Sequence, residues 1–159
     1  MSLLDKEPVK RVERSLKAFN KNQKVIILNS SARTALEAAS SLGCTVGAIV
    51  KSLLIKTENR FILCLVAGDR KASLNKIKKI LNIKDASMAS ANDVKNITGF
   101  TIGGVSPIGH LNEINIYMDN SLKRFTSLFA AAGHPNCVFE INYSDLQKIT
   151  NGFIEEITE

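Results

Sequence analysis

The sequence predicts a single α/β domain, spanning residues 1–159, built on a mixed and partly closed β-sheet flanked by helices. Three observations support this prediction. The 159 residues suffice for one hydrophobic core but not for two comfortable domains. Apolar residues make up 45% of the chain, which is ordinary for a globular protein. Strand and helix patterns mix without regular βαβ alternation, so a doubly wound sheet fits less well.

The first half of the chain alternates between two kinds of periodicity. Apolar residues spaced by three and four from Val9 to Phe19 indicate an amphipathic helix. Thr34 is a good N-cap, and Glu37 and Gly43 complete the signals of a capped helix. In chain order we expect a helix over 9–19, a strand over 24–28, a helix over 34–43, and two strands of a hairpin, 48–55 and 61–68, joined by a turn at 57–60.

The second half continues with short elements. Ser90 and Gly99 mark the two ends of one expected helix. In chain order we expect helices over 73–82 (with Leu74, Ile77, Ile80 and Leu81 inward) and 90–99, a glycine-rich loop at 101–110, a strand at 114–119, a helical turn at 121–125, strands at 128–131 and 137–141, a helix at 143–151 and a last strand at 152–157.

Lys51 is unusual in the first hairpin strand. Alternation places its side chain on one face with Ile49, Leu53 and Ile55. Spacing alone leaves two interpretations open. The lysine either covers apolar surface with its stem while the amine reaches water, or it is the cation of a functional site.

The segment TIGGVSPIGH, residues 101–110, is the second unusual feature. Three glycines and a proline indicate a loop of fixed shape whose backbone can approach a ligand closely. Its amide groups would be free to bind a carbonyl oxygen or an anion. A purely structural turn is the alternative, and the motif alone does not decide between them.

Charge points toward an acidic partner. The formal net charge is +6, which favours a polyanion but also fits plain solubility. The basic residues gather in or beside two expected helices, where each group is either a binding face or a solvated one. The first group is Lys10, Arg11, Arg14 and Lys17, and the second is Lys71, Lys76, Lys78 and Lys79.

Several classes of function find no support. The three cysteines are widely spaced and there are two histidines, so no zinc pattern can be assembled, and we expect no metal or other cofactor. Nucleophile elbow, HExxH and Walker motifs are absent, and nothing points to a triad built on His110 or His134. No signal-peptide-like or membrane-spanning run occurs, so we expect a reduced, cytoplasmic protein without a membrane partner.

Together these segments resemble the YbaK/prolyl-tRNA-synthetase-associated domain family of aminoacyl-tRNA deacylases, which remove wrong amino acids from tRNA. The resemblance runs in order through nearly the whole chain after the first helix. Its blocks are TALEAASSLG, IVKSLLIK, LVAGDRKASLNKIKKIL, ITGFTIGGVSPIGH, IYMDNSL and AAGHPNCVFEINYSDLQKITNG. It implies a barrel-like mixed sheet with a pocket between the lysine strand and the glycine loop.

The resemblance also implies roles for individual residues. Lys51 matches the family's essential lysine, which contacts the ester at the tRNA 3′ end, with Ser52 beside it. Asp119 matches a usually acidic position with a role in binding or in holding the loop. The remaining implied site residues are Gly103, Gly104, Val105, Ser106 and Pro107 around the aminoacyl carbonyl, and Gly133 and His134 at the far side of the pocket.

The same resemblance suggests partners and a substrate. A free-standing deacylase acting in trans on the acceptor end of mischarged tRNA is expected, with an aminoacyl-tRNA synthetase as a further partner. A non-catalytic module that binds tRNA or a synthetase is the alternative. Lys76, Lys78 and Lys79 would contact tRNA phosphates. Ala131 stands where cysteine-specific members carry serine, which favours another small amino acid.

Overall fold

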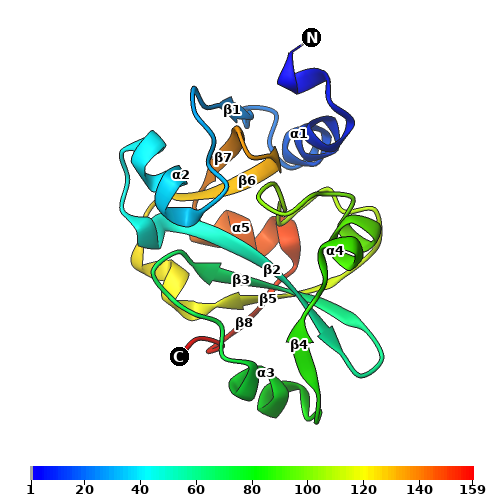
Figure 1. The fold of residues 1–159 in the computed structure, drawn as a ribbon. Helices are drawn as coiled ribbons and strands as arrows, with labels where there is room; N and C mark the ends of the chain where they lie inside the picture. The colour runs from blue at the N-terminus through cyan, green and yellow to red at the C-terminus, as the bar shows by residue number, and fades with distance from the viewer. Residues whose placement is uncertain (1) are drawn as a thin grey trace.

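Eight strands form one mixed sheet in the computed structural model, which describes residues 2–159 (Figure 1). The strands are β1 (Ile26–Ile27), β2 (Ile49–Thr57), β3 (Phe61–Ala67), β4 (Ala86–Met88), β5 (Asn115–Asp119), β6 (Leu128–His134), β7 (Cys137–Ile141) and β8 (Phe153–Glu155). Their order is β1-β7-β6-β2-β3-β5-β8, and β4 pairs with β2. Parallel pairing of β2 with β6 and of β3 with β5 makes the sheet mixed, as predicted. The edge strands β1 and β8 do not pair with each other, so the sheet is mostly open.

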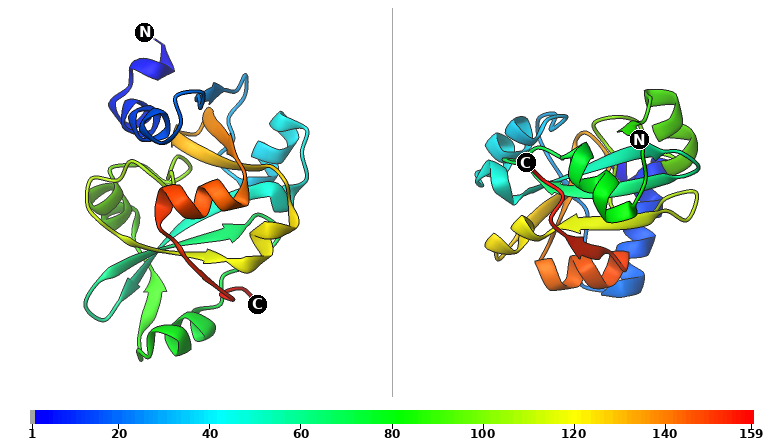
Figure 2. Two further views of the ribbon diagram at one scale, coloured as in Figure 1. Left: turned by 180° about the vertical axis from the view of Figure 1, so that it is seen from behind. Right: turned by 90° about the horizontal axis from the view of Figure 1, so that it is seen from below.

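Helices cover the sheet and its ends. The α-helices are α1 (Glu7–Phe19), α2 (Ala35–Leu42), α3 (Leu74–Leu81), α4 (Ala91–Thr98) and α5 (Tyr143–Thr150). Single 3-10 turns occupy Leu3–Asp5, Val46–Ala48 and Asn120–Arg124. Helix α5 lies behind the sheet in Figure 1 and in front of it in the reverse view of Figure 2. Both views place α1 and α3 at opposite ends of the molecule.

The helix ends follow from local chemistry. The hydroxyls of Thr34, Ser73 and Ser90 each accept a hydrogen bond from the backbone amide three residues on, which begins α2, α3 and α4. Gly43 and Gly99 end two of these helices in the left-handed conformation that glycine adopts without strain. These signals are contiguous in sequence, and the predicted helices are confirmed to within about two residues.

Four details differ from the sequence prediction. Strand β4 was not expected, because three residues carry too little periodicity, and it is recognised only through its pairing with β2. Strand β6 runs on to His134 through an irregularity after Ala131. Of the strand expected over 24–28, only Ile26 and Ile27 pair with a neighbouring strand. The side chain of Ile80, which was expected to point inward, is 37% exposed.

Strand β2 is central, and both of its faces meet apolar side chains. Val50 and Leu54 belong to the main core. Leu53 and Ile55 pack on the opposite face in a smaller cluster with Ile77 of α3. Within the described residues no helix is both long and apolar enough to cross a membrane.

Candidate functional site

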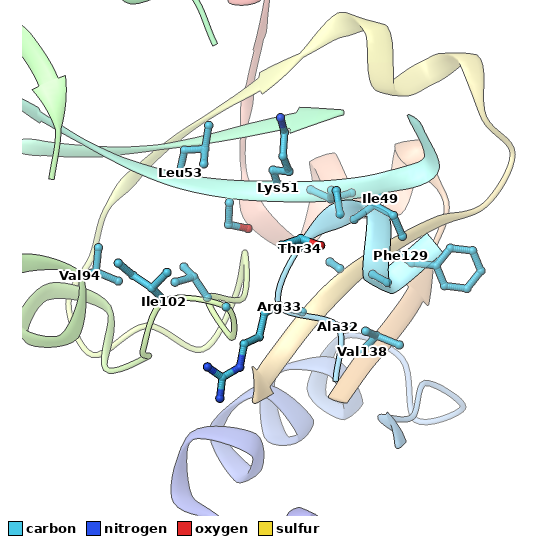
Figure 3. Close-up of a pocket in the computed structure, with 18 of the residues that line it drawn as sticks. Ala32, Arg33, Thr34, Ile49, Lys51, Leu53, Val94, Ile102, Phe129 and Val138 are labelled. Carbon is cyan, nitrogen blue, oxygen red and sulfur yellow. The ribbon is translucent and has the colours of Figure 1, made fainter. Parts of the chain in front are cut away.

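A cavity of about 380 Å³ lies beside β2 (Figure 3). Residues 49–54 of β2 form one wall, and Ile102, Gly103 and Val105 of the glycine loop form another. The cavity is completed by residues 32–35 at the start of α2 and by residues 129–131 of β6. A pocket between the lysine strand and the glycine loop, as the resemblance implied, is therefore present.

The cavity collects part of the predicted site. Lys51, Ser52, Gly103 and Val105 line it, as does Ala131. Ser52 Oγ is buried and has no hydrogen-bond partner among residues 2–159. The other predicted residues lie elsewhere, and their contacts show what each does.

The Lys51 side chain is directed to the loop that follows β3. Its ammonium donates a hydrogen bond to the carbonyl oxygen of Arg70 at 2.5 Å. Figure 3 shows the side chain rising from β2 together with Leu53, while Arg33 and Ile102 lie on the other side of the strand. Partial burial lowers the pKa of Lys51, and the nearby Asp69 carboxylate opposes that shift.

A chain of polar contacts supports this loop. Asp69 accepts two hydrogen bonds from the Arg124 guanidinium, at 2.7 and 3.0 Å, and these lower the pKa of its carboxyl. Arg124 Nε donates to the carbonyl oxygen of Ser121 at 2.7 Å, and Ser121 donates through its amide and hydroxyl to Asp119. The loop that holds the Lys51 ammonium is thereby connected to Asp119.

Asp119 is consequently a support rather than a wall of the cavity. Its carboxylate is fully buried and also accepts from the amide of Ile157 at 2.8 Å and the hydroxyl of Thr158 at 3.2 Å. The prediction that Asp119 binds substrate is not supported by its position. The alternative role in holding a loop fits, but the loop is that of Asp69 and Arg70, not the glycine loop.

The glycine loop has a defined internal structure. Gly103 has a φ of 96°, whereas Gly104 does not have a positive φ. A Cβ on Gly104 would lie 3.0 Å from the backbone of His134, so the absent side chain lets the loop pack on β6. The Gly104 amide donates to Thr101 at 3.0 Å. Gly104 therefore allows the loop to pack closely on β6 and does not line the cavity.

Ser106 and Pro107 also lie outside the cavity. Both are buried, and the Ser106 carbonyl oxygen accepts a 2.7 Å hydrogen bond from His110 Nε2. The Ser106 hydroxyl also accepts a hydrogen bond from the Ile108 amide at 3.3 Å, so Ser106 stabilises the loop internally. The contact of Ser106 and Pro107 with substrate stays a prediction.

One guanidinium ties the two ends of this loop together. Arg11 of α1 donates to the carbonyl oxygen of Gly109 at 3.0 Å and to that of Gly99 at 2.9 Å. It also lies over the Phe100 ring, 5.0 Å from the centroid. The sequence assigned Arg11 to a basic face, but these contacts are internal.

Gly133 and His134 belong to the junction between β6 and α1. A Cβ on Gly133 would meet the Pro8 carbonyl oxygen at 2.7 Å, so this glycine permits the close approach of α1 and does not line the cavity. His134 Nδ1 accepts a hydrogen bond from the Asn136 amide at 3.0 Å. Burial, followed by the charges of Lys6 and Arg33, lowers the pKa of His134.

The three predicted tRNA-binding lysines differ in their contacts. Lys76 donates to Glu156 at 3.0 Å and to the Thr158 carbonyl oxygen at 2.7 Å, which anchors the C-terminal segment. Lys78 and Lys79 instead border a shallow depression with Lys84. Only this second pair remains available to an acidic partner.

Sequence reasoning missed the contribution of α2. Arg33 and Thr34 line the cavity, and Arg33 Cγ lies 3.3 Å from a Cβ position on Gly103. The capping signals at 34–43 predict a helix but not a cavity wall, because nothing local places this helix against the glycine loop. Among residues 2–159 no group of three or more His, Cys, Asp or Glu side chains could hold a metal ion.

Comparisons with known proteins agree with this architecture. The family model described as the aminoacyl-tRNA editing domain matches residues 29–149. The uncharacterised protein YwhH of Bacillus subtilis (strain 168) is 34% identical over 143 residues, 89% of this chain and 90% of YwhH. A proline–tRNA ligase of Caldicellulosiruptor bescii is 31% identical over 138 residues, which are 86% of this chain but 24% of the ligase.

A solved structure gives the same answer for the fold. A crystal structure described as that of a proposed trans-editing enzyme for prolyl-tRNA synthetase superposes with a TM-score of 0.91. The match covers 97% of this chain and 98% of the other, at 33% identity. The chain therefore belongs to the aminoacyl-tRNA editing domain family.

Proposed function

We propose that the chain is an aminoacyl-tRNA deacylase that hydrolyses the ester bond of mischarged tRNA in trans. The observation that carries this proposal is the cavity between the β2 segment that contains Lys51 and Ser52 and the glycine loop. Family membership supports the substrate class. The similar solved structure is described as that of a proposed trans-editing enzyme for prolyl-tRNA synthetase, which supports action in trans.

The cavity offers what this hydrolysis requires. An aminoacyl ester is activated by its own α-ammonium group, so a positioned water and an oxyanion site suffice. The amides of Gly103 and Val105 donate no hydrogen bond within residues 2–159, and both residues line the cavity. Each well-placed donor to the oxyanion is worth about 3 kcal/mol. Lys51 would contribute the cation at the ribose and ester by leaving the Arg70 carbonyl oxygen, because its side chain now lies on the other side of β2 from Arg33 and Ile102.

The proposed substrate carries a small amino acid such as alanine or serine rather than cysteine. Ala131 lines the cavity with a methyl group where a hydroxyl would favour cysteine. A serine substrate could give the unpartnered Ser52 Oγ a hydrogen bond. Apolar walls separate neighbouring amino acids by only about 1–3 kcal/mol per methylene, so alanine and serine should be poorly separated.

A non-catalytic tRNA-binding or synthetase-binding module is the second candidate. The observation that favours it is the Lys51 ammonium, which is already bonded to the Arg70 carbonyl oxygen. A substrate must compete with this bond, whereas a binding module would not need the ammonium at all.

Hydrolysis of a panel of charged tRNAs decides between the two. Alanyl-, seryl-, cysteinyl- and prolyl-tRNA would be compared by kcat/KM under one set of conditions, each against its spontaneous hydrolysis. We expect turnover of the alanyl and seryl substrates above background. Binding of these tRNAs without faster hydrolysis would identify a non-catalytic binding module instead. A preference for cysteinyl-tRNA would refute only the interpretation of Ala131 and would leave the deacylase assignment intact.

A further inference from the structure

Three basic groups converge beside the glycine loop, at the junction of α1, the start of α2 and the end of β6. They are Lys6, Arg33 and His134. Arg33 packs along Gly103, and the His134 backbone packs against Gly104, so the two residues lie against adjacent glycines of the loop. Lys6 immediately precedes α1, whose first turn approaches Gly133.

These groups are not neutralised within the protein. The salt bridges of residues 2–159 join Arg14 to Glu7, Lys76 to Glu156 and Arg124 to Asp69, and none includes Lys6 or Arg33. Neither side chain donates a hydrogen bond to another described residue. The three groups therefore keep their donors for a ligand from outside.

His134 is oriented to take part. Because its Nδ1 accepts a hydrogen bond from the Asn136 amide, the proton of the neutral ring sits on Nε2. The ring can therefore donate a hydrogen bond from Nε2 while the Asn136 amide remains bonded to Nδ1. After burial, the charges of Lys6 and Arg33 lower the pKa of His134, which agrees with the positions of all three residues around the glycine loop.

We infer that Lys6, Arg33 and His134 form a binding site for a phosphodiester of the tRNA 3′ end. Arg33 lines the cavity and extends toward α1 in Figure 3, on the other side of β2 from the Lys51 side chain. A chain whose terminal ester enters the cavity thus meets a site for its backbone phosphate at the mouth. Guanidinium, ammonium and imidazole donors around glycine backbone suit a phosphate.

This inference rests on the proposed function for the identity of the ligand. It goes further by setting the direction in which the 3′ end of the tRNA enters the site. The phosphate lies on the α1 side of the glycine loop, and the terminal ribose lies toward β2. The Lys78 and Lys79 depression at the opposite end of the molecule would be a separate contact.

A histidine titration by NMR tests the site, since the chain has two histidines and His110 serves as an internal control. The probe is the trinucleotide CCA, and adenosine is its phosphate-free counterpart. A bound phosphate should raise the pKa of His134 with CCA, but not with adenosine, and should leave His110 unchanged. An unmoved His134 at saturating CCA, or an equal shift with adenosine, would overturn the site.

Arg33→Gln provides the matched variant, with Lys148→Gln at an exposed position of α5 as the control. In the free protein Arg33→Gln should raise the pKa of His134, since it removes a positive charge. It should weaken CCA binding severalfold and reduce the slope of log affinity against log salt by ~0.7. Lys148→Gln should change neither. Equal CCA affinity of wild type and Arg33→Gln would refute the assignment.

Failure of this site and failure of the deacylase assignment give different results. If wild type and Arg33→Gln hydrolyse mischarged tRNA with the same kcat/KM, the phosphate site is wrong and the enzyme stands. If CCA shifts His134 as expected but no charged tRNA is hydrolysed, the phosphate site stands and the module interpretation of the chain replaces the enzyme.

Discussion

The Lys51 ammonium lies 2.5 Å from the carbonyl oxygen of Arg70, so the cation of the candidate site is held by backbone and not by a carboxylate. A carbonyl oxygen orients the ammonium without cancelling its charge. The Asp69 carboxylate next in sequence is occupied by Arg124. This arrangement fixes the ammonium beside the loop that follows β3, where no ion pair with Asp69 competes for it.

Lys51→Met should abolish deacylation while the fold persists. Methionine keeps most of the apolar stem but removes the ammonium, whose partial burial is itself unfavourable. We expect kcat/KM on mischarged tRNA to fall at least about a hundredfold, with an unchanged melting temperature. Lys56→Met, at an exposed position of the same strand, is the control. Equal turnover by Lys51→Met and wild type would remove Lys51 from the site.

Arg124→Gln should lower activity with little effect on stability. Exposed ion pairs contribute about 0–1 kcal/mol, so losing the pair with Asp69 should hardly change the free energy of unfolding. The Arg70 carbonyl should nevertheless become less well placed for Lys51, and kcat should fall. Arg14→Gln breaks a comparable exposed pair with Glu7 far from this loop. The supporting role of Arg124 is wrong if both variants retain full kcat.

Arg11→Lys should reduce kcat about tenfold, equivalent to about 1.4 kcal/mol. A lysine cannot bond the carbonyl oxygens of Gly99 and Gly109 together, because it lacks the planar fork of arginine. The loop ends should separate and displace Gly103 and Val105, while KM for tRNA stays near its wild-type value. Arg14→Lys on the same helix is the comparison. A change in melting temperature with kcat intact would show that Arg11 serves stability alone.

Lys78→Gln and Lys79→Gln together should weaken tRNA binding without loss of stability. Each lost phosphate contact should reduce the salt slope by ~0.9, and hydrolysis of a small aminoacyl ester should be spared. Lys76→Gln should behave oppositely, with near-normal tRNA affinity and a lower melting temperature, because its ammonium holds the C-terminal segment. Similar tRNA affinities for the double variant and wild type would exclude α3 from the interface.

Stability should fall as the pH drops below about 6.5, partly through His110. Burial lowers the pKa of His110, so the unfolded chain binds a proton at a higher pH than the folded chain does. Above that pH the His110 ring is neutral in both the folded and the unfolded chain, so its protonation no longer changes the free energy of unfolding. Urea unfolding at pH 7.5 and 5.0 would measure the loss, which His110→Asn should reduce. The pKa of His134 is also lowered, so His134→Asn should remove the part of the pH-dependent stability loss that comes from this second histidine. A pH profile that His110→Asn leaves unaltered would contradict this sign.

Much of the fold could be predicted because its signals are local. The caps of α2 and α4 act within one turn of the helix that they begin or end. The hairpin of β2 and β3 is encoded by two apolar runs and a short turn, and its register sets Lys51 opposite Val66. The strand lysine and the glycine loop were visible for the same reason, since each departs from the pattern around it.

The sequence by itself determined the helices, most strands, the family and the two segments that face the cavity. Only the tertiary structure decided which side chains reach that cavity. Asp119 lies in one of the matching blocks, yet the parallel pairing of β5 with β8 turns its carboxylate to the C-terminal segment. Arg33 carries no motif, yet the packing of the glycine loop places it in the wall. Such contacts join residues far apart in the chain, and their geometry depends on the whole packed core rather than on neighbours in sequence.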